Sequence, residues 1–304
     1  ILESAIKDIS GNEISGEVAF KLYDTYGFPV DLTADVARER GLTIDMAGFD
    51  SEMSIQKERA RKAGDFESKK SSVVIENPTE FLGYDHFENN ATIAAIIRNN
   101  EAVNELSEGQ EAIVILDQSS FYGESGGQVG DQGTLSNKGT QFKVSDTQKQ
   151  ASSAFEHFGI LDSGSLKVGD KVNAIVDIER RKKIMGNHSA THLLHESLRL
   201  ILGERVNQKG SLVEPDKLRF DFSHGEALSK SNLDQVEVLV NKQILGNSEV
   251  ITEETDIESA KKKGAMALFG EKYGENVRVL SMGDENFSVE LCGGTHVERL
   301  GEIG

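Results

Sequence analysis

Between residues 80 and 180 the chain breaks into short runs rich in β-branched residues, and this pattern constrains the fold more than any other feature. Turn residues separate the runs, among them Glu108-Gly109 and Gly169-Asp170. Several short strands at such spacing predict a small β-barrel or a sandwich. The expected strands cover residues 91–98, 111–117, 141–146 and 171–178.

The residues before this region are expected to be helical. Ser15 is a candidate cap for a first helix, which Gly27-Phe28-Pro29 stops because the residue before a proline avoids the helical region. Asp31 or Thr33 is the expected cap of a second helix through Arg40, and a third runs from about 46 to 62. The segment 64–79 is predicted to be a linker.

The last third of the chain mixes helices and strands. Helices are expected over 180–202, over 229–245 with Ser229 as cap, and over 256–263, and strands over 211–214, 217–222, 249–255, 277–281 and 286–291. We therefore predict a multi-domain α+β chain. Its parts are a helical segment with a linker (1–79), a small β-barrel (80–180) and an α+β core (181–304).

Charge and composition exclude several classes of protein. The 304 residues suffice for about two domains, and 51 acidic against 33 basic residues give a formal net charge of −18. This excludes a uniformly basic nucleic-acid coat, although residues 181–304 carry the least net negative charge of the three parts. A single cysteine excludes an intramolecular disulfide framework and favours a reducing compartment. With no apolar run near the ~20 residues of a membrane helix and no signal peptide, we expect no membrane partner and a cytoplasmic protein.

The first and last residues, Ile1 and Gly304, lead us to expect a fragment of a larger protein.

The strongest chemical signal is a set of histidines and one cysteine. His188 and His192 lie four positions apart in the predicted helix 180–202, so their imidazoles share one helical face, and His195 follows on roughly the same face. Cys292 ends a predicted strand and precedes His296 by four residues, with two glycines between them that let the backbone turn tightly. Three imidazoles and a thiolate suit one Zn²⁺ ion. The alternative is a pair of polar residues on a partly exposed helix and a buried, inert thiol.

The neighbouring residues limit which class of metal site this can be. Ser189 and Ala190 follow His188 where a metalloprotease would carry the glutamate of its HExxH motif, so that class is disfavoured. Four protein ligands are typical of structural zinc, whereas catalytic zinc keeps a position open. Either one ligand is loose, or the metal expands its shell, or it positions a substrate without making the nucleophile.

A glycine-rich segment at 121–131 is a second candidate site. Gly126, Gly127 and Gln128 are expected to offer backbone N–H groups to a phosphate or ribose. The segment is neither a Walker loop nor a Rossmann fingerprint, since no Gly-Lys-Ser/Thr and no strand–helix unit accompany it. The alternative is a tight loop that joins barrel strands.

Weaker candidates lie after the histidine helix. Lys209, in the run 208–211, is expected to line the same cleft, and Arg219 alternates with apolar neighbours in the strand 217–222. His224 is expected to be an ordinary surface histidine. The run 261–263 is expected to be a solvated lysine face or a contact to RNA phosphates.

Six segments of the chain resemble the alanyl-tRNA synthetase family, and the resemblance covers nearly the whole chain. Residues 22–33 resemble its helical tRNA-recognition region, and FYGESGGQVGDQG resembles the glycine-rich motif of its barrel. Three more runs, NHSATHLLH, NQKGSLV and RFDFSH, together with ELCGGTHV, are similar to its editing domain, and a bacterial type is expected.

The resemblance implies a function for each matched residue. The family joins alanine to its tRNA with ATP and Mg²⁺, in a domain that we expect to lie outside this chain. Its editing domain hydrolyses Ser-tRNA(Ala) and Gly-tRNA(Ala), because an alanine pocket cannot reject glycine, which is smaller, and cannot strongly reject serine, which adds only one hydroxyl. The implied zinc ligands are His188, His192, Cys292 and His296, and the implied editing-pocket residues are Thr191 and Gln208. The implied partner is the acceptor end of tRNA(Ala), with Thr191 on the serine hydroxyl and Gln208 on the ester or water.

Three alternatives stay open from the sequence. One is a free-standing trans-editing protein, against which the helices at 1–62 argue. The second is a metal-stabilised tRNA-binding module without activity. The third is a structural zinc domain for oligomer contacts. No general base and no oligomeric state can be assigned from the residues.

Overall fold

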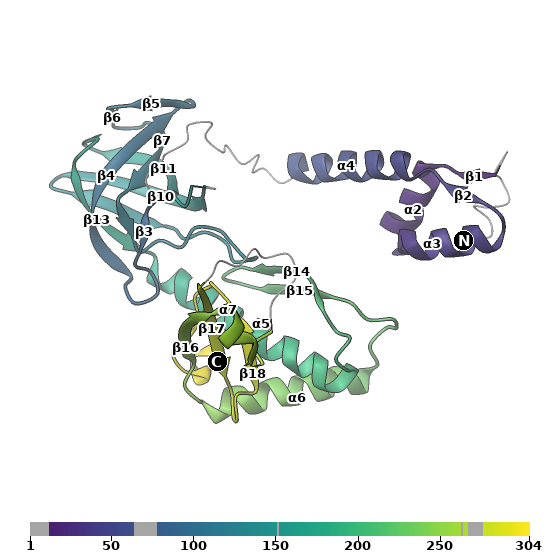
Figure 1. Ribbon diagram of the computed structural model, residues 1–304. Helices are drawn as coiled ribbons and strands as arrows, with labels where there is room; N and C mark the ends of the chain where they lie inside the picture. Colours follow the sequence, from purple (N-terminus) through teal and green to yellow (C-terminus); the bar gives the residue numbers. More distant parts are fainter. Residues whose placement is uncertain (1–11, 64–77, 151, 263, 267–275) are drawn as a thin grey trace. The chain divides into compact units, whose positions relative to one another are not determined.

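The computed structural model describes residues 12–63, 78–150, 152–262, 264–266 and 276–304 (Figure 1). The chain divides into two compact units, Ile1–Lys70 and Ser71–Gly304. The expected linker at 64–79 lies outside the described residues except at its last two positions. Among the helices described, none has the length and apolar character needed to span a membrane.

The first unit contains the three expected helices, α2 (Gly16–Tyr26), α3 (Val30–Glu39) and α4 (Met46–Ala63). The backbone N–H of Val18 donates to the Ser15 hydroxyl, and Gly27 ends α2 in the left-handed conformation (φ 65°), so the predicted cap and the predicted stop are both confirmed. The predicted cap of α3 is wrong. That helix begins directly after Pro29, and Thr33 lies in its first turn with its hydroxyl donating to the Pro29 carbonyl (3.2 Å).

The first unit is closed by a short parallel pair, β1 (Glu13–Ile14) and β2 (Thr43–Ile44). Its core consists of Ile14, Ala19, Ala37 and Phe49.

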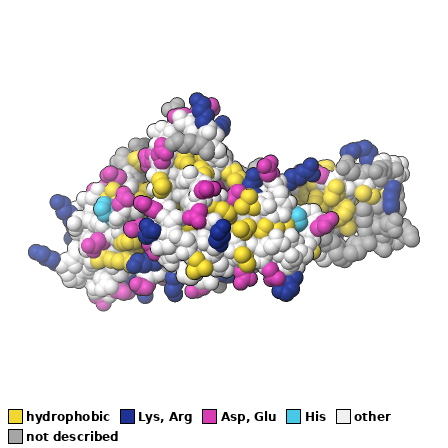
Figure 2. Space-filling model, turned by 90° about the horizontal axis from the view of Figure 1, so that it is seen from below, with side chains coloured by type: hydrophobic (Ala, Val, Ile, Leu, Met, Phe, Trp, Pro, Cys, Tyr) yellow, Lys and Arg dark blue, Asp and Glu magenta, His cyan; other side chains and the backbone are white. Residues whose placement is uncertain are grey.

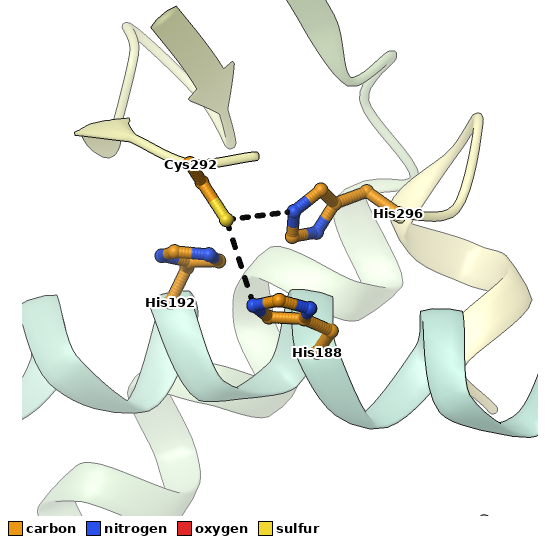
Figure 3. Close-up of side chains that lie close together, drawn as sticks. All are labelled: His188, His192, Cys292 and His296. Carbon is orange, nitrogen blue, oxygen red and sulfur yellow. Dashed lines mark hydrogen bonds between the residues drawn. The ribbon is translucent and has the colours of Figure 1, made fainter. Parts of the chain in front are cut away.

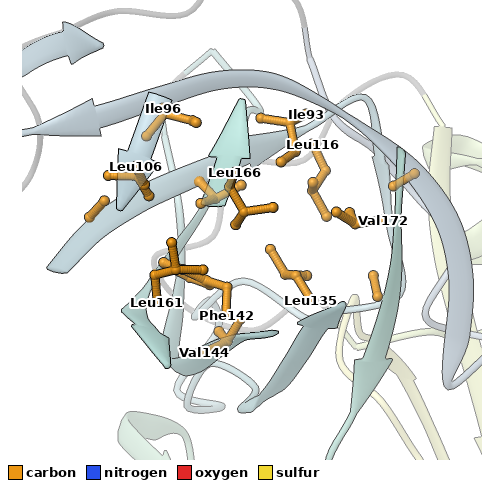
Figure 4. Close-up of a cluster of buried hydrophobic side chains, with 14 of the residues drawn as sticks. Ile93, Ile96, Leu106, Leu116, Leu135, Phe142, Val144, Leu161, Leu166 and Val172 are labelled. Atoms are coloured by element: carbon orange, nitrogen blue, oxygen red, sulfur yellow. The ribbon is translucent and has the colours of Figure 1, made fainter. Parts of the chain in front are cut away.

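The expected barrel is present in the second unit, and it is closed rather than a sandwich. Its strands are β4 (Glu88–Arg98), β7 (Glu111–Leu116), β9 (Gly133–Asn137), β10 (Thr140–Lys149), β11 (Phe155–Ser163) and β13 (Lys171–Val176). They are ordered β13-β9-β10-β11-β7-β4, and the antiparallel pairing of β13 with β4 closes the ring. Alternate residues of β10 are buried, as a half-buried strand requires. The side chains that fill the interior include Ile93, Leu116, Leu135, Phe142 and Leu161 (Figure 4).

Two of these strands, β9 and β11, escaped prediction. β11 carries Glu156, His157 and Gly159 within its apolar run, which hides its strand character. Both polar side chains are buried and paired. Gln150 donates to the Glu156 carboxylate (2.7 Å), and His157 Nε2 lies 2.8 Å from the Ser119 hydroxyl.

Shorter pairs complete the barrel region. β3 (Glu80–Phe81) runs parallel to β8 (Gln118–Ser119). β5 (Glu101–Val103) pairs antiparallel with the end of β4, and β6 (Glu105–Ser107) pairs with β12 (Ser165–Lys167).

Helix α5 (Ile178–Leu202) follows the barrel without a linker. Asp177 caps it, one residue after β13 ends, by accepting from the Arg180 N–H (3.0 Å). Arg181 is fully buried, pairs with Asp131, and donates to the carbonyls of Gly83 (2.8 Å) and Ser120 (2.9 Å). These contacts of Arg181 join the first turn of α5 to the loops of the barrel, and barrel and helix lie in one compact unit.

The rest of the second unit mixes helices and strands, as expected. A hairpin of β14 (Gln208–Val213) and β15 (Leu218–Phe222) precedes α6 (Lys230–Gly246), which Ser229 caps. The sheet β16-β17-β18 (Ile251–Asp256, Asn276–Met282 and Ser288–Leu291) is antiparallel, and α7 (Ile257–Lys262) and a 3₁₀ turn (Leu300–Ile303) complete the fold. The core between α5, α6 and the sheet includes Leu193, Leu280, Met282, Val297 and Leu300.

Candidate metal centre and pocket

Helix α5 carries the first half of the site. His188 and His192 lie one turn apart on its buried face, and their rings stack at 5.3 Å between centroids with an interplanar angle of 9°. This is the arrangement that the spacing of the two histidines predicts.

The second half follows strand β18. Cys292 is the first residue after the strand, and a turn through Gly293 and Gly294 brings His296 back beside it (Figure 3). A Cβ at position 294 would lie 2.1 Å from Cε1 of His188, so only glycine allows this approach of backbone and imidazole. The Gly294 N–H also donates to the Cys292 sulfur (3.4 Å).

These four side chains converge on one point. Their ligand atoms all lie within 4.8 Å of one another, and Cys292 Sγ is 3.5 Å from His188 Nε2 and 3.3 Å from His296 Nε2. His192 Nε2 is buried and has no hydrogen-bond partner among the described residues. A buried nitrogen without a partner beside a thiol and two imidazoles fits a metal ligand. The cluster can therefore hold a metal ion.

A second layer of side chains orients the imidazoles. His188 Nδ1 lies 2.7 Å from the Gln128 amide oxygen, His192 Nδ1 lies 2.8 Å from a Glu290 oxygen, and His296 Nδ1 lies 3.2 Å from the Ser189 hydroxyl. Such partners fix which ring nitrogen faces a metal. Ser189 and Glu290 were not predicted as site residues. The signal for Glu290 was its place two residues before Cys292, on the same side of an extended strand.

The charges of the cluster favour a metal-binding thiolate. Burial raises the pKa of Cys292, but the imidazoles of His188, His296 and His192 bring that pKa well below its usual value. Burial lowers the pKa of His192, whereas Glu290 and then Cys292 raise it to about 10. Burial lowers the pKa of His296 to about 3. Thiolate and neutral imidazole are the forms that bind metals, so Cys292 and His296 are in the right forms, whereas His192 must release its proton when a metal binds.

The turn after Cys292 is held by Tyr84, from the barrel region, and by Arg278, from strand β17. Tyr84 donates to the Gly293 carbonyl (2.8 Å), and Arg278 donates to the Gly294 carbonyl (2.8 Å). The Arg278 guanidinium lies 4.1 Å from the centroid of the Tyr84 ring, a cation–π contact that joins these two side chains.

A pocket lies directly against the cluster. It is lined by Gly126, His188, Thr191, His192, His195, Gln208, Ser211, Phe220 and Glu290. His195 does not join the four ligand residues. Its Nδ1 lies 3.0 Å from the second Glu290 oxygen, so one carboxylate binds two histidines of α5.

Besides His188 and His192, the structure brings three predicted site residues to this pocket, namely Thr191, Gln208 and Gly126. The Thr191 hydroxyl donates to the Asn187 carbonyl of its own helix (2.8 Å), which leaves its oxygen free to accept. Gln208 begins β14, and Gly126 belongs to a tight turn beside that hairpin.

The other predicted residues lie elsewhere. Gln128 is fully buried, and its amide donates to Thr295 Oγ1 (2.9 Å) and accepts from the Thr295 N–H (3.0 Å). The Gly127 carbonyl accepts from the Val213 N–H (2.7 Å), so the glycine-rich turn holds β14. Lys209 and Arg219 are exposed on the hairpin, and Arg219 pairs with Asp221 (3.1 Å).

The charges on the surface are mixed. On the face shown in Figure 2, Lys and Arg side chains alternate with Asp and Glu side chains over the described residues. Lys261 and Lys262 are exposed, in keeping with the predicted solvated face, and Lys261 lies 3.9 Å from Glu258.

Comparison with known proteins identifies the family. Residues 1–180 match the model of class II (A) tRNA synthetases. The chain is 59% identical over all its 304 residues to the alanine–tRNA ligase of Ruthia magnifica subsp. Calyptogena magnifica. The chain belongs to the alanyl-tRNA synthetase family. Residues 277–304, which carry Cys292 and His296, match the second additional domain of threonyl and alanyl tRNA synthetases.

Other alanine–tRNA ligases are similar to this member of the alanyl-tRNA synthetase family. Those of Vesicomyosocius okutanii and Hydrogenovibrio crunogenus are 59% and 57% identical over the whole chain. The chain spans 35% of the length of each of these curated relatives.

Proposed function

We propose that this chain is the editing part of an alanyl-tRNA synthetase, which hydrolyses the ester of Ser-tRNA(Ala) or Gly-tRNA(Ala). The observation that carries the proposal is the pocket in which Thr191 and Gln208 stand beside the four-residue His/Cys cluster. The two matched family models and the similarity to alanine–tRNA ligases over the whole chain support it.

In this proposal Thr191 selects serine. Its hydroxyl proton is used by the Asn187 carbonyl, so the oxygen accepts a hydrogen bond from the serine hydroxyl. Alanine has no such donor, and an unpaired buried oxygen disfavours it. Gln208, which also lines the pocket, holds the ester carbonyl or the attacking water.

One Zn²⁺ ion would be held by the four side chains of the cluster, since a thiolate and three imidazoles form a donor set that suits this metal. These side chains are His188, His192, Cys292 and His296. When bound, the ion supplies Lewis-acid polarisation at the edge of the pocket. Gln128, Glu290 and Ser189 keep the ligand nitrogens oriented. The proposed contacts to the acceptor end of tRNA(Ala) are Gly126 and Gly127 in the turn, and Lys209 and Arg219 on the exposed hairpin face. Gln128, expected from the sequence to join them, is buried and bonded to His188 instead.

The complete protein would join alanine to tRNA(Ala) with ATP and Mg²⁺ in the cytoplasm, in a part that this chain does not span. Within the chain, residues 1–79 would serve tRNA recognition, residues 80–180 would form the barrel, and residues 181–304 would carry the editing core.

The test compares hydrolysis of Ser-tRNA(Ala) and Ala-tRNA(Ala) by the zinc-loaded chain and by its His192→Ala variant. We expect serine-selective hydrolysis that the variant loses. His224→Ala is the matched control, because this histidine is exposed and lies outside the pocket lining. Tight binding of the tRNA without hydrolysis by the wild type would contradict editing and support a tRNA-binding module instead.

A further inference from the structure

We propose that His195 is the general base of the editing reaction, with Glu290 as its orienting partner. This inference rests on the proposed function and adds the group that takes the proton of the attacking water.

The first argument is the hydrogen bond that fixes the ring. His195 is 3% exposed, and its Nδ1 lies 3.0 Å from Glu290 Oε1. A carboxylate only accepts hydrogen bonds, so Nδ1 carries the proton. The Nε2 atom of the neutral imidazole therefore keeps a lone pair.

The second argument is the free position of that lone pair. His195 Nε2 is buried and has no hydrogen-bond partner among the described residues, although buried polar atoms are nearly always paired. His192 Nε2 is also unpartnered, but it belongs to the metal cluster. His195 stands outside that cluster and lines the same pocket as Thr191 and Gln208. Its open acceptor thus suits a water molecule or a substrate.

The third argument is the arrangement of the two histidines on one carboxylate. Glu290 Oε2 lies 2.8 Å from His192 Nδ1, while Oε1 binds His195. Glu290 itself is 1% exposed, so the pair is held rigidly. The Phe220 ring, 5.1 Å from the His195 ring between centroids, covers the imidazole with an apolar side chain. A positioned base next to a shielded pocket is what proton transfer in hydrolysis requires.

The reaction balances with water as the only co-reactant. His195 Nε2 takes one proton from water while the water oxygen bonds to the ester carbonyl carbon. The bond between that carbon and the ribose oxygen then breaks, and the ribose oxygen takes the proton back from Nε2. The products are a free amino acid and a tRNA with its terminal hydroxyl restored, and His195 returns to its starting form.

The test uses His195→Asn and His195→Ala in the zinc-loaded chain. Asparagine can keep an N–H donor for Glu290 but has no basic nitrogen. We expect the single-turnover hydrolysis of Ser-tRNA(Ala) to fall by about 10²–10⁴-fold in His195→Asn, with zinc content and tRNA binding unchanged. Added imidazole should restore part of the rate of His195→Ala, which a purely structural role would not allow. His224→Ala again serves as control.

Three results would overturn the inference. A His195→Asn rate close to that of the wild type would remove His195 from the reaction. Loss of zinc together with the rate would show that the side chain only supports the metal cluster. Failure of imidazole to raise the rate of His195→Ala would exclude a proton-transfer role. Absence of hydrolysis by the wild type would instead refute the proposed function, and this inference with it.

Discussion

The amide oxygen of Gln128 lies 2.7 Å from Nδ1 of His188, which links the glycine-rich loop of the barrel region to the first histidine of the metal cluster. The same oxygen accepts from the Thr295 N–H at 3.0 Å. One buried side chain thus connects the loop, helix α5 and the turn between Cys292 and His296.

Replacement of Gln128 should weaken metal binding without removing a ligand. In Gln128→Ala the Nδ1 of His188 loses its hydrogen-bond partner. Mutation of a residue that hydrogen-bonds to a metal ligand typically lowers metal affinity by about 10–100-fold. A competition titration with a chromophoric zinc chelator measures the effect. Gln235→Ala is the control, because this glutamine is exposed on α6. Equal zinc affinities of the two variants would contradict the orienting role.

The sequence predicted the local elements of the barrel and of the metal cluster, but not the pairing between distant segments. Local patterns found four barrel strands and the His188/His192 pair, because apolar spacing and helical geometry act over a few residues. The closure of the barrel by β13 and β4 depends on pairing between distant strands, which no local pattern records. Strand β11 was missed because its buried Glu156 and His157 are satisfied by partners from other segments.

The second layer of the site shows the same limit. Gln128 was predicted as a ligand-binding residue from its glycine-rich loop, and its burial against His188 follows only from tertiary packing. Glu290 and Ser189 gave no motif of their own. Their hydrogen bonds to His192 and His296 form only because distant segments of the chain pack together in the fold.

Gly294→Ala should damage the metal cluster through a steric clash. The added Cβ would lie 2.1 Å from His188 Cε1, so the turn or the imidazole must shift. Overpacking of a buried site costs typically about 1–3 kcal/mol, and we also expect a lower zinc content. Thermal unfolding and metal analysis measure both effects. Gly225→Ala is the matched control, because a Cβ there meets no atom within 4 Å, and it should resemble the wild type.

Arg181→Met should destabilise the second unit strongly. Arg181 and Asp131 are 0% and 1% exposed, so the variant leaves a buried carboxylate without its partner. Breaking a buried ion pair from one side costs roughly 3–5 kcal/mol. Urea unfolding measures the loss, and Lys182→Ala, an exposed neighbour on α5, is the control. The double variant with Asp131→Asn should recover part of the stability, and a double variant as unstable as the single one would count against this explanation.

Acid should destabilise the barrel through His157. Burial lowers the pKa of this histidine to about 4, against the smaller raising effect of its bond to the Val114 carbonyl. The unfolded chain therefore takes up a proton near pH 6.5, whereas the folded chain takes it up only near pH 4. Stability is complete above pH 6.5 and falls as the pH drops between these two values, because the unfolded state binds more protons there.

Urea unfolding at pH 7.5 and pH 4.5 tests this linkage. With about 1.4 kcal/mol per pKa unit, the wild type should lose roughly 2–3 kcal/mol from this residue at the lower pH. His157→Asn keeps a side-chain N–H that can donate to the Val114 carbonyl but cannot take up a proton in this range, so its loss should be smaller by that amount. Its stability at pH 7.5 will be lower, since the hydrogen bond that the Ser119 hydroxyl donates to His157 Nε2 (2.8 Å) is lost. The quantity to compare is the difference between the two pH values. An equal acid-induced loss in both proteins would assign the pH dependence to other groups.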